Sequence, residues 1–229
     1  MNVVRTLHHF PLDPASRQVR LSLGEKKLNF VEEVVRYWEQ PRKFLELNPS
    51  GLTPVLVEQA GASEALAVCE ARAILEHLER EVPGYDLLGA TPAERAETRR
   101  LMQWFDRKFD NEVNAYLLSE KLEKRLTKAG APDLYSLRTG REALRVHLAY
   151  IEELLRQRDW LAGRSLSLAD FAAAAHLSVL DYFGDVPWRD FAITKTWYMR
   201  IKSRPAFRPL LLDRWPGLPP SAHYDDLDF

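Results

Sequence analysis

The sequence has 229 residues, of which 46% are hydrophobic and 28% charged, and its formal net charge at pH 7 is -1. Such a chain can form one large domain or two small ones with a sizeable core, and its balanced charge excludes a global basic field for nucleic acid. The single cysteine, Cys69, excludes an internal disulfide framework and fits a reducing compartment.

Neither a signal peptide nor a membrane span is expected. The N-terminal residues lack the basic, apolar and small-residue regions of a secretory signal. No apolar run approaches the roughly 18 residues that a spanning helix needs. We therefore expect a cytoplasmic protein with no membrane insertion and no nucleic-acid partner.

The N-terminal third alternates short apolar or β-branched runs with amphipathic ones, a pattern typical of an α/β domain. A short apolar run after Pro54 predicts a strand. Further along the chain, Ile74, Leu75 and Leu78 have the spacing of one helix face. The predicted strands are 3–8, 30–35, 55–57 and 65–68, and the predicted helices are 16–26 and 71–81.

The remainder is predicted to be helical. Thr91, Pro92 and Glu94 have the spacing of a helix start, and apolar residues recur every four positions from Leu101 to Leu117, which predicts one long helix toward Lys128. Further helices are expected at about 140–157, from about 168, and at 190–203. We therefore expect a domain at 1–82, a linker at 83–92, an all-α domain at 93–215 and a Pro-rich acidic tail at 216–229.

A capping box is predicted at Ser167–Asp170, between the apolar residues Leu166 and Phe171. We interpret it as a helix start and not as a catalytic acid. Losing the cap should cost roughly 1 kcal/mol of stability.

The dipeptide Thr53-Pro54 stands directly before a short apolar strand, which is a position that proline tolerates. An isolated X-Pro bond is usually trans, since only about 5–6% are cis. A cis bond would expose the backbone groups of Thr53 to a peptide-like ligand.

Several segments, in order along nearly the whole chain, resemble those of cytosolic glutathione transferases. They are Pro14–Leu21, Asn48–Val57, Glu70–Ile74, Ser167–Asp170 and Ser203–Phe207. The resemblance implies the glutathione-transferase fold, with an α/β thioredoxin-like N-terminal domain and an all-α C-terminal domain, usually as a homodimer. It also implies that the Thr53-Pro54 bond is cis.

The glutathione site that this resemblance implies is altered at two positions. Where many bacterial relatives have Cys-Pro or Ser-Pro, this chain has Asp13-Pro14, and a carboxylate beside a thiolate disfavours the thiolate. Ser16 is the remaining hydroxyl for the catalytic role. In the family a Ser follows the Glu at this place and binds the γ-glutamyl carboxylate of glutathione. In this chain Ala71 stands where that Ser would be.

We therefore expect a relict glutathione site at Ser16, Thr53, Pro54 and Glu70, with no catalytic residue and no cofactor. The histidines are isolated or adjacent along a strand, so we expect no metal. The alternative is an active transferase that uses Ser16 and glutathione to conjugate or reduce small electrophiles.

Two stretches are candidate partner contacts. Arg36, Tyr37 and Trp38 are residue types enriched at binding hot spots, although aromatic packing beneath a loop explains them equally well. The tail combines Tyr224 with Asp225, Asp226 and Asp228, and the alternative there is a disordered terminus.

A closer resemblance rests on His9–Arg20, Arg36–Glu39 and the Asp-Leu-Asp-Phe ending. These segments resemble the glutathione-transferase-like cell-division proteins of alphaproteobacteria, which bind the tubulin-like FtsZ. The resemblance implies a homodimeric adaptor that binds FtsZ filaments at the division site, with two equal binding surfaces that bend or bundle them. An adaptor for another cytoplasmic protein is a third hypothesis.

Overall fold

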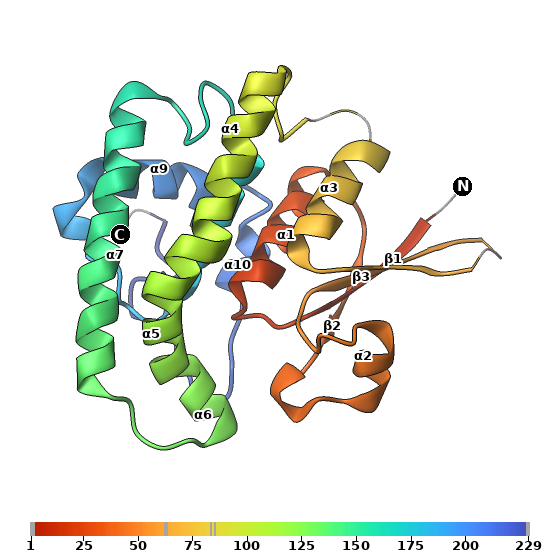
Figure 1. Cartoon of the computed structure of the whole chain (residues 1–229), viewed down its shortest axis with the longest axis horizontal. Helices are drawn as coiled ribbons and strands as arrows, with labels where there is room; N and C mark the ends of the chain where they lie inside the picture. Colours follow the sequence, from red (N-terminus) through yellow and green to blue (C-terminus); the bar gives the residue numbers. More distant parts are fainter. Residues whose placement is uncertain (1–2, 62–63, 83, 85, 228–229) are drawn as a thin grey trace.

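The computed structural model describes residues 3–61, 64–82, 84 and 86–227. Its N-terminal part is a four-stranded sheet in the order β2-β1-β3-β4, which lies beside a larger helical part (Figure 1). β1 pairs in parallel with β2 and antiparallel with β3, and β3 pairs antiparallel with β4. The strands are β1 (Val3–His9), β2 (Val31–Val34), β3 (Val55–Ala60) and β4 (Leu66–Cys69).

Helices α1 (Pro14–Glu25) and α3 (Ala71–Glu81) lie between the sheet and the helical part (Figure 1). The buried Leu7 and Leu56 are directly paired in the sheet and join Ile74 and Leu78 in the main core. Helix α2 (Arg42–Leu47) contributes Phe44 to a smaller core with Val35 and Val55. The predicted strands and both predicted helices of this part are confirmed, with no end shifted by more than three residues.

The helical part begins with one long helical run that ends at Lys128, which has a left-handed backbone, φ 57°. Within the described residues, no helix has both the length and the apolar character that crossing a bilayer requires. The run comprises α4 (Pro92–Gln103), the π-helical η2 (Trp104–Asn114), α5 (Ala115–Leu118), η3 (Ser119–Glu123) and α6 (Lys124–Thr127). The helices that follow are α7 (Leu134–Gln157), α8 (Leu168–Tyr182), α9 (Ala192–Lys202) and α10 (Arg208–Leu211). Short 3₁₀ turns lie at Tyr37–Glu39 in the sheet part and at Trp188–Asp190 in the helical part.

Helix α7 begins at Leu134, earlier than the predicted start near Gly140. The carboxylate of Asp133 accepts a hydrogen bond from the Ser136 amide at 2.8 Å and so caps the first turn. Leu134 itself is 80% exposed, so the apolar periodicity on which the prediction relied does not extend to this turn.

Helix α8 is the centre of the molecule, since every one of its residues is buried. Its start has the predicted capping box, in which Asp170 reaches back to the Ser167 amide at 2.9 Å. Asp170 also accepts hydrogen bonds from the Leu161 amide and the Trp197 indole. The cap therefore anchors a loop and α9 as well as α8.

As far as Leu227, where the described residues end, the C-terminal tail is docked against the helical part. Tyr224 is fully buried and its hydroxyl donates to the Leu210 carbonyl at 2.9 Å. The buried Lys202 ammonium donates to the Asp226 carbonyl at 2.7 Å, and the Ser221 amide donates to the Tyr182 carbonyl at 2.7 Å. Asp228 lies outside the described residues.

Two buried arginines of α1 join the sheet part to the helical part. Asp213 Oδ2 lies 3.1 Å from Arg17 Nη2 and 2.7 Å from Arg20 Nη1. Arg17 also donates to the Ser178 hydroxyl of α8, and Arg20 donates to Glu32 of β2. All the residues of this Arg17–Arg20–Asp213 cluster are at most 9% exposed, so removing one partner leaves buried charge uncompensated.

We expect Asp213→Ala to lower the free energy of unfolding by about 3–5 kcal/mol, as measured by urea denaturation. The matched control is Asp190→Ala, which breaks the exposed Arg145–Asp190 pair and should cost about 1 kcal/mol or less. Similar losses in the two variants would show that the cluster does not hold the two parts together.

Candidate functional site

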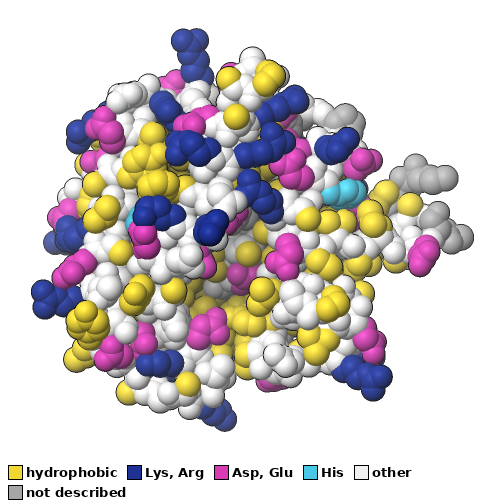
Figure 2. Space-filling model, in the orientation of Figure 1, with side chains coloured by type: hydrophobic (Ala, Val, Ile, Leu, Met, Phe, Trp, Pro, Cys, Tyr) yellow, Lys and Arg dark blue, Asp and Glu magenta, His cyan; other side chains and the backbone are white. Residues whose placement is uncertain are grey.

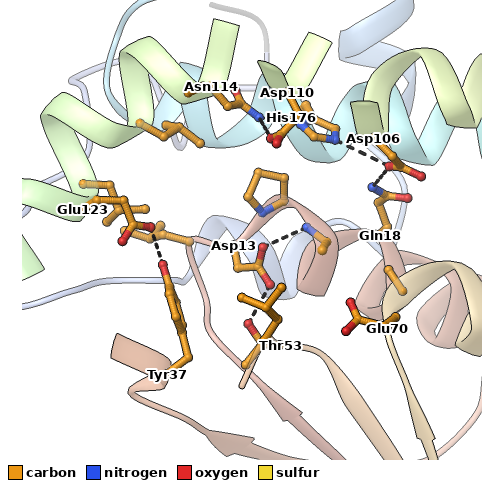
Figure 3. A pocket seen from close by; sticks show the side chains of 18 of the residues that line it. Asp13, Gln18, Tyr37, Thr53, Glu70, Asp106, Asp110, Asn114, Glu123 and His176 are labelled. Atoms are coloured by element: carbon orange, nitrogen blue, oxygen red, sulfur yellow. Dashed lines mark hydrogen bonds and ion pairs between the residues drawn. The ribbon is translucent and has the colours of Figure 1, made fainter. Parts of the chain in front are cut away.

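A pocket of about 520 Å³ lies between the sheet part and the helical part. Its lower wall in Figure 3 carries Asp13, Thr53 and Glu70, and its upper wall carries Asp106, Asp110, Asn114 and His176. In Figure 2 the surface between the two parts is hollowed, with acidic side chains near its edge. The volume is in the range of small-molecule sites.

Asp13 occupies the N-terminus of α1 and is held by four hydrogen bonds. Its carboxylate accepts from the amides of Ala15 and Ser16, from the Ser16 hydroxyl at 2.6 Å and from the Thr53 hydroxyl at 2.8 Å. Burial raises the pKa of Asp13 above its ordinary value, and the hydrogen bonds from Ser16 and Thr53 oppose that shift. The helix N-terminus, which attracts anions, is therefore already capped by the protein's own carboxylate.

Ser16 is fully buried and its hydroxyl is used twice. It donates to Asp13 and accepts from the Phe10 amide at 3.2 Å. A hydroxyl that holds glutathione as thiolate must present its proton to the ligand. The geometry of Ser16 instead fixes the turn before α1.

Of the remaining predicted positions, Thr53 and Glu70 line the lower wall of the pocket, and Pro54 follows Thr53 without lining it. The Thr53-Pro54 bond is cis, as the family resemblance implied. Glu70 is exposed and accepts a hydrogen bond from the Ser50 hydroxyl at 2.8 Å. Ala71 follows it as the first residue of α3, where its methyl group offers no hydrogen bond to a ligand carboxylate.

The upper wall is polar in a way that the sequence did not reveal. Gln18 donates to Asp106 at 2.7 Å, and Asn114 donates to Asp110 at 3.0 Å. His176 lies 2.6 Å from the Asn114 amide nitrogen. Asp106, Asp110 and Asn114 are four residues apart along η2, which is the spacing of a solvated helix face. Only the tertiary structure shows that they line the pocket opposite α1.

No group of three or more His, Cys, Asp or Glu side chains within the described part of the chain is arranged to hold a metal ion. Cys69 lies apart from the pocket's upper wall, and burial raises the pKa of its thiol. The thiolate, the reactive form, is thereby disfavoured.

The aromatic loop at Arg36–Trp38 packs against Trp215, the residue directly before the tail. Trp38 meets both Phe10 and Trp215 edge to face, with ring centroids 5.2 and 5.8 Å apart, and the exposed Arg36 guanidinium lies 5.9 Å from the Trp215 ring centre. The Tyr37 ring packs on Trp38, and its hydroxyl donates to Glu123 at the pocket. Trp215 was missed by sequence reasoning, because nothing in the local pattern links it to Trp38.

The predicted contact residues of the tail separate into two kinds. Tyr224 belongs to the core, which corrects its expected role as an exposed contact, because Leu210 and α8 enclose it. Asp225 and Asp226 are exposed, and Asp225 pairs with Arg214, the residue before Trp215. The aromatic loop contacts Trp215, and Asp225 contacts the neighbouring Arg214; Arg36–Trp38, Trp215 and Asp225 are together called the loop–tail surface here.

Two family models match the chain: the glutathione S-transferase N-terminal domain over residues 14–81 and the glutathione S-transferase C-terminal domain over residues 135–205. With the sheet, the helical part and the pocket between them, these matches confirm the predicted fold. The chain belongs to the glutathione S-transferase superfamily.

Within that superfamily the chain is 72% identical to FtsZ-localized protein A of Caulobacter vibrioides over 229 residues, which is 100% of each chain. The solved structure of FzlA from C. crescentus matches with a TM-score of 0.96 over 98% of this chain and 99% of that one. A glutathione S-transferase structure from Rhodospirillum rubrum matches with a TM-score of 0.94 and 47% identity, covering 98% and 100%.

We expect Asp13→Ala to lower the free energy of unfolding by roughly 2–3 kcal/mol, since it removes a helix cap and leaves two hydroxyls without their acceptor. Asp13→Asn keeps an oxygen at the cap and should cost less than half as much. Thermal and urea unfolding of the two variants measure the difference. An unchanged stability in Asp13→Ala would mean that the carboxylate has no structural role.

Proposed function

We propose that this protein is a non-catalytic adaptor that binds FtsZ filaments in bacterial cell division. The observation that carries the proposal is the full-length, 72% identity to a protein named for its localization with FtsZ. The match covers the whole of both chains, so the aligned region includes Arg36–Trp38, Trp215 and the tail.

The architecture of the pocket supports the absence of transferase chemistry. Asp13 fills the helix N-terminus at which a thiolate would be stabilised, Ser16 has its hydroxyl engaged, and Ala71 lacks the ligand-binding hydroxyl. A glutathione thiolate there would face a carboxylate, and like charges raise the pKa of the thiol. Each of these features opposes the alternative of an active glutathione transferase.

The loop–tail surface is the proposed contact with the filament. Trp38 and Trp215 supply a rigid aromatic anchor of the kind that dominates binding energy. Arg36 and Asp225 supply exposed charges at its edge, which tune the association rate and orientation of a partner.

We expect Trp38→Ala to reduce co-sedimentation with FtsZ polymers at least several-fold, since hot-spot aromatics cost about 2 kcal/mol or more when truncated. The matched control is Trp160→Ala, which removes a half-buried tryptophan packed on Arg200 at a different place on the surface. The control should bind like the unmodified protein.

A charge reversal that leaves the core intact provides a second test. Asp225→Lys should weaken co-sedimentation more at low salt than at high salt, whereas Asp190→Lys, also at an exposed acid of an ion pair, should not. If the unmodified protein fails to sediment with FtsZ polymers at low salt, the adaptor proposal is wrong. Retention on immobilised glutathione with competitive elution would instead support the transferase alternative.

We further propose that the protein acts as a homodimer and changes filament curvature or bundling. Two copies of the loop–tail surface related by a two-fold axis would link neighbouring filament segments through avidity. Tyr135 and Val146 of α7 are 77% and 70% exposed. Their spacing of eleven residues places them on one helix face, which gives such a dimer an apolar contact.

Sedimentation equilibrium should give a dimer at micromolar concentration, and Tyr135→Glu with Val146→Glu should shift it toward monomer. Leu212→Glu places the same charge at another exposed apolar side chain and should leave the dimer intact. A monomer at every concentration would exclude the dimer, although monomeric binding to FtsZ would remain measurable by co-sedimentation.

A further inference from the structure

A hydrogen bond across the end of the pocket ties the Arg36–Trp38 loop to the helical part. The Tyr37 hydroxyl donates to the carboxylate of Glu123, the last residue of η3. Figure 3 shows this contact, here called the Tyr37–Glu123 bridge, with Tyr37 pointing from the sheet part toward Glu123. Among the described residues, no other hydrogen bond joins residues 36–40 to the helical part.

The two partners of the bridge depend on each other. Burial raises the pKa of the Tyr37 hydroxyl, and the nearby Glu123 and Asp13 raise it further, so the phenol keeps its proton and acts as the donor. Within the part of the chain that the structure describes, the Glu123 carboxylate accepts a hydrogen bond from Tyr37 alone. Because a partly buried carboxylate is costly to leave without a donor, the bridge is favoured over its separated partners.

The ring of Tyr37 transmits this constraint to Trp38. The two rings meet edge to face, with centroids 5.3 Å apart and planes at 84°, and Phe10 packs edge to face against both. Aromatic contacts tolerate centroid separations of about 4.5–7 Å, whereas a hydrogen bond to a carboxylate is directional. The bridge therefore fixes the Tyr37 ring, and that ring restricts the orientation of Trp38.

The backbone of the loop does not supply the same constraint. Its hydrogen bonds within residues 36–40 are those of one 3₁₀ turn, from the Glu39 amide to the Arg36 carbonyl and from the Gln40 amide to the Tyr37 carbonyl. Gln40 ends the turn in a left-handed conformation, φ 47°, which is unfavourable for a residue with a Cβ. Such a conformation persists only where surrounding contacts hold it.

We propose that the Tyr37–Glu123 bridge is a positioning contact that holds Trp38 in the orientation in which the loop–tail surface binds FtsZ filaments. This inference rests on the adaptor function proposed above. Tyr37 and Glu123 act through Trp38. Without the bridge, the binding orientation of the loop is less populated, and the apparent affinity falls by the same fraction.

NMR of the tryptophan indole groups in ¹⁵N-labelled protein tests the bridge without FtsZ. Trp38→Phe assigns the Trp38 signal among those of the six tryptophans. Glu123→Leu removes the acceptor and should shift or broaden the Trp38 signal, as should Tyr37→Phe, which keeps the ring. Glu123→Gln keeps an acceptor oxygen and should leave the signal near its original position.

The matched control for Tyr37→Phe is Tyr150→Phe, since the Tyr150 ring packs on a different tryptophan, Trp104, at 4.4 Å. It should leave the Trp38 signal unchanged. The remaining tryptophan signals verify that each variant is folded. An unmoved Trp38 signal in Glu123→Leu would overturn the proposal, and so would equal shifts in Glu123→Leu and Glu123→Gln.

Co-sedimentation with FtsZ polymers tests the consequence for binding. Tyr37→Phe and Glu123→Leu should each weaken binding by roughly three- to tenfold, and the double variant should lose no more than either single variant. Glu123→Gln and Tyr150→Phe should bind like the unmodified protein. A moved Trp38 signal with unchanged binding, or losses that add in the double variant, would overturn the proposal.

Failure of the adaptor function has a different signature. If the unmodified protein itself does not sediment with FtsZ polymers, the adaptor function is wrong. A Trp38 signal that moves in Glu123→Leu but not in Glu123→Gln would still support the bridge as the contact that positions the loop.

Discussion

The buried contact of Asp213 with Arg17 and Arg20 positions much of what surrounds it. Arg17 reaches from α1 to Ser178 of α8 and to Asp213, which lies just before Trp215, so one carboxylate connects the sheet part, the central helix and the start of the tail. Buried ion pairs seldom exceed well-packed apolar residues in net stabilisation, yet they strongly penalise arrangements that separate the partners. The relative placement of the two parts, and hence the shape of the pocket between them, depends on this connection.

The Asp13 cap and the aromatic cluster around Phe10 lie on either side of the turn before α1 and have separate roles. On one side Asp13, Thr53 and Ser16 satisfy one another and occupy the place of a catalytic hydroxyl. On the other side Phe10 supports Trp38 and Trp215. Tyr37 connects the two features, because it packs on Trp38 while its hydroxyl donates to Glu123 at the pocket. A change in the pocket could therefore reach the loop–tail surface through one side chain.

Local signals predicted the elements well. The helix starts at Thr91 and Ser167 and the helix at Ala71–Glu81 follow from caps and apolar periodicity. The sequence also identified Asp13 and Ala71 as departures from a glutathione site. It did not reveal the pairing of Arg17 with Asp213, which are 196 positions apart, nor the burial of Tyr224. Such contacts depend on how the elements pack, and Asp106 and Asp110 by themselves read as a solvated helix face.

The docked tail affects how a partner would be met. A free acidic peptide loses conformational entropy when it becomes ordered on binding, which weakens its affinity. Here Tyr224 and the Lys202 contact to the Asp226 carbonyl have already ordered the chain around Asp225. The acidic group is thus preorganised during folding, so a partner would bind it as part of a rigid surface rather than as a flexible arm.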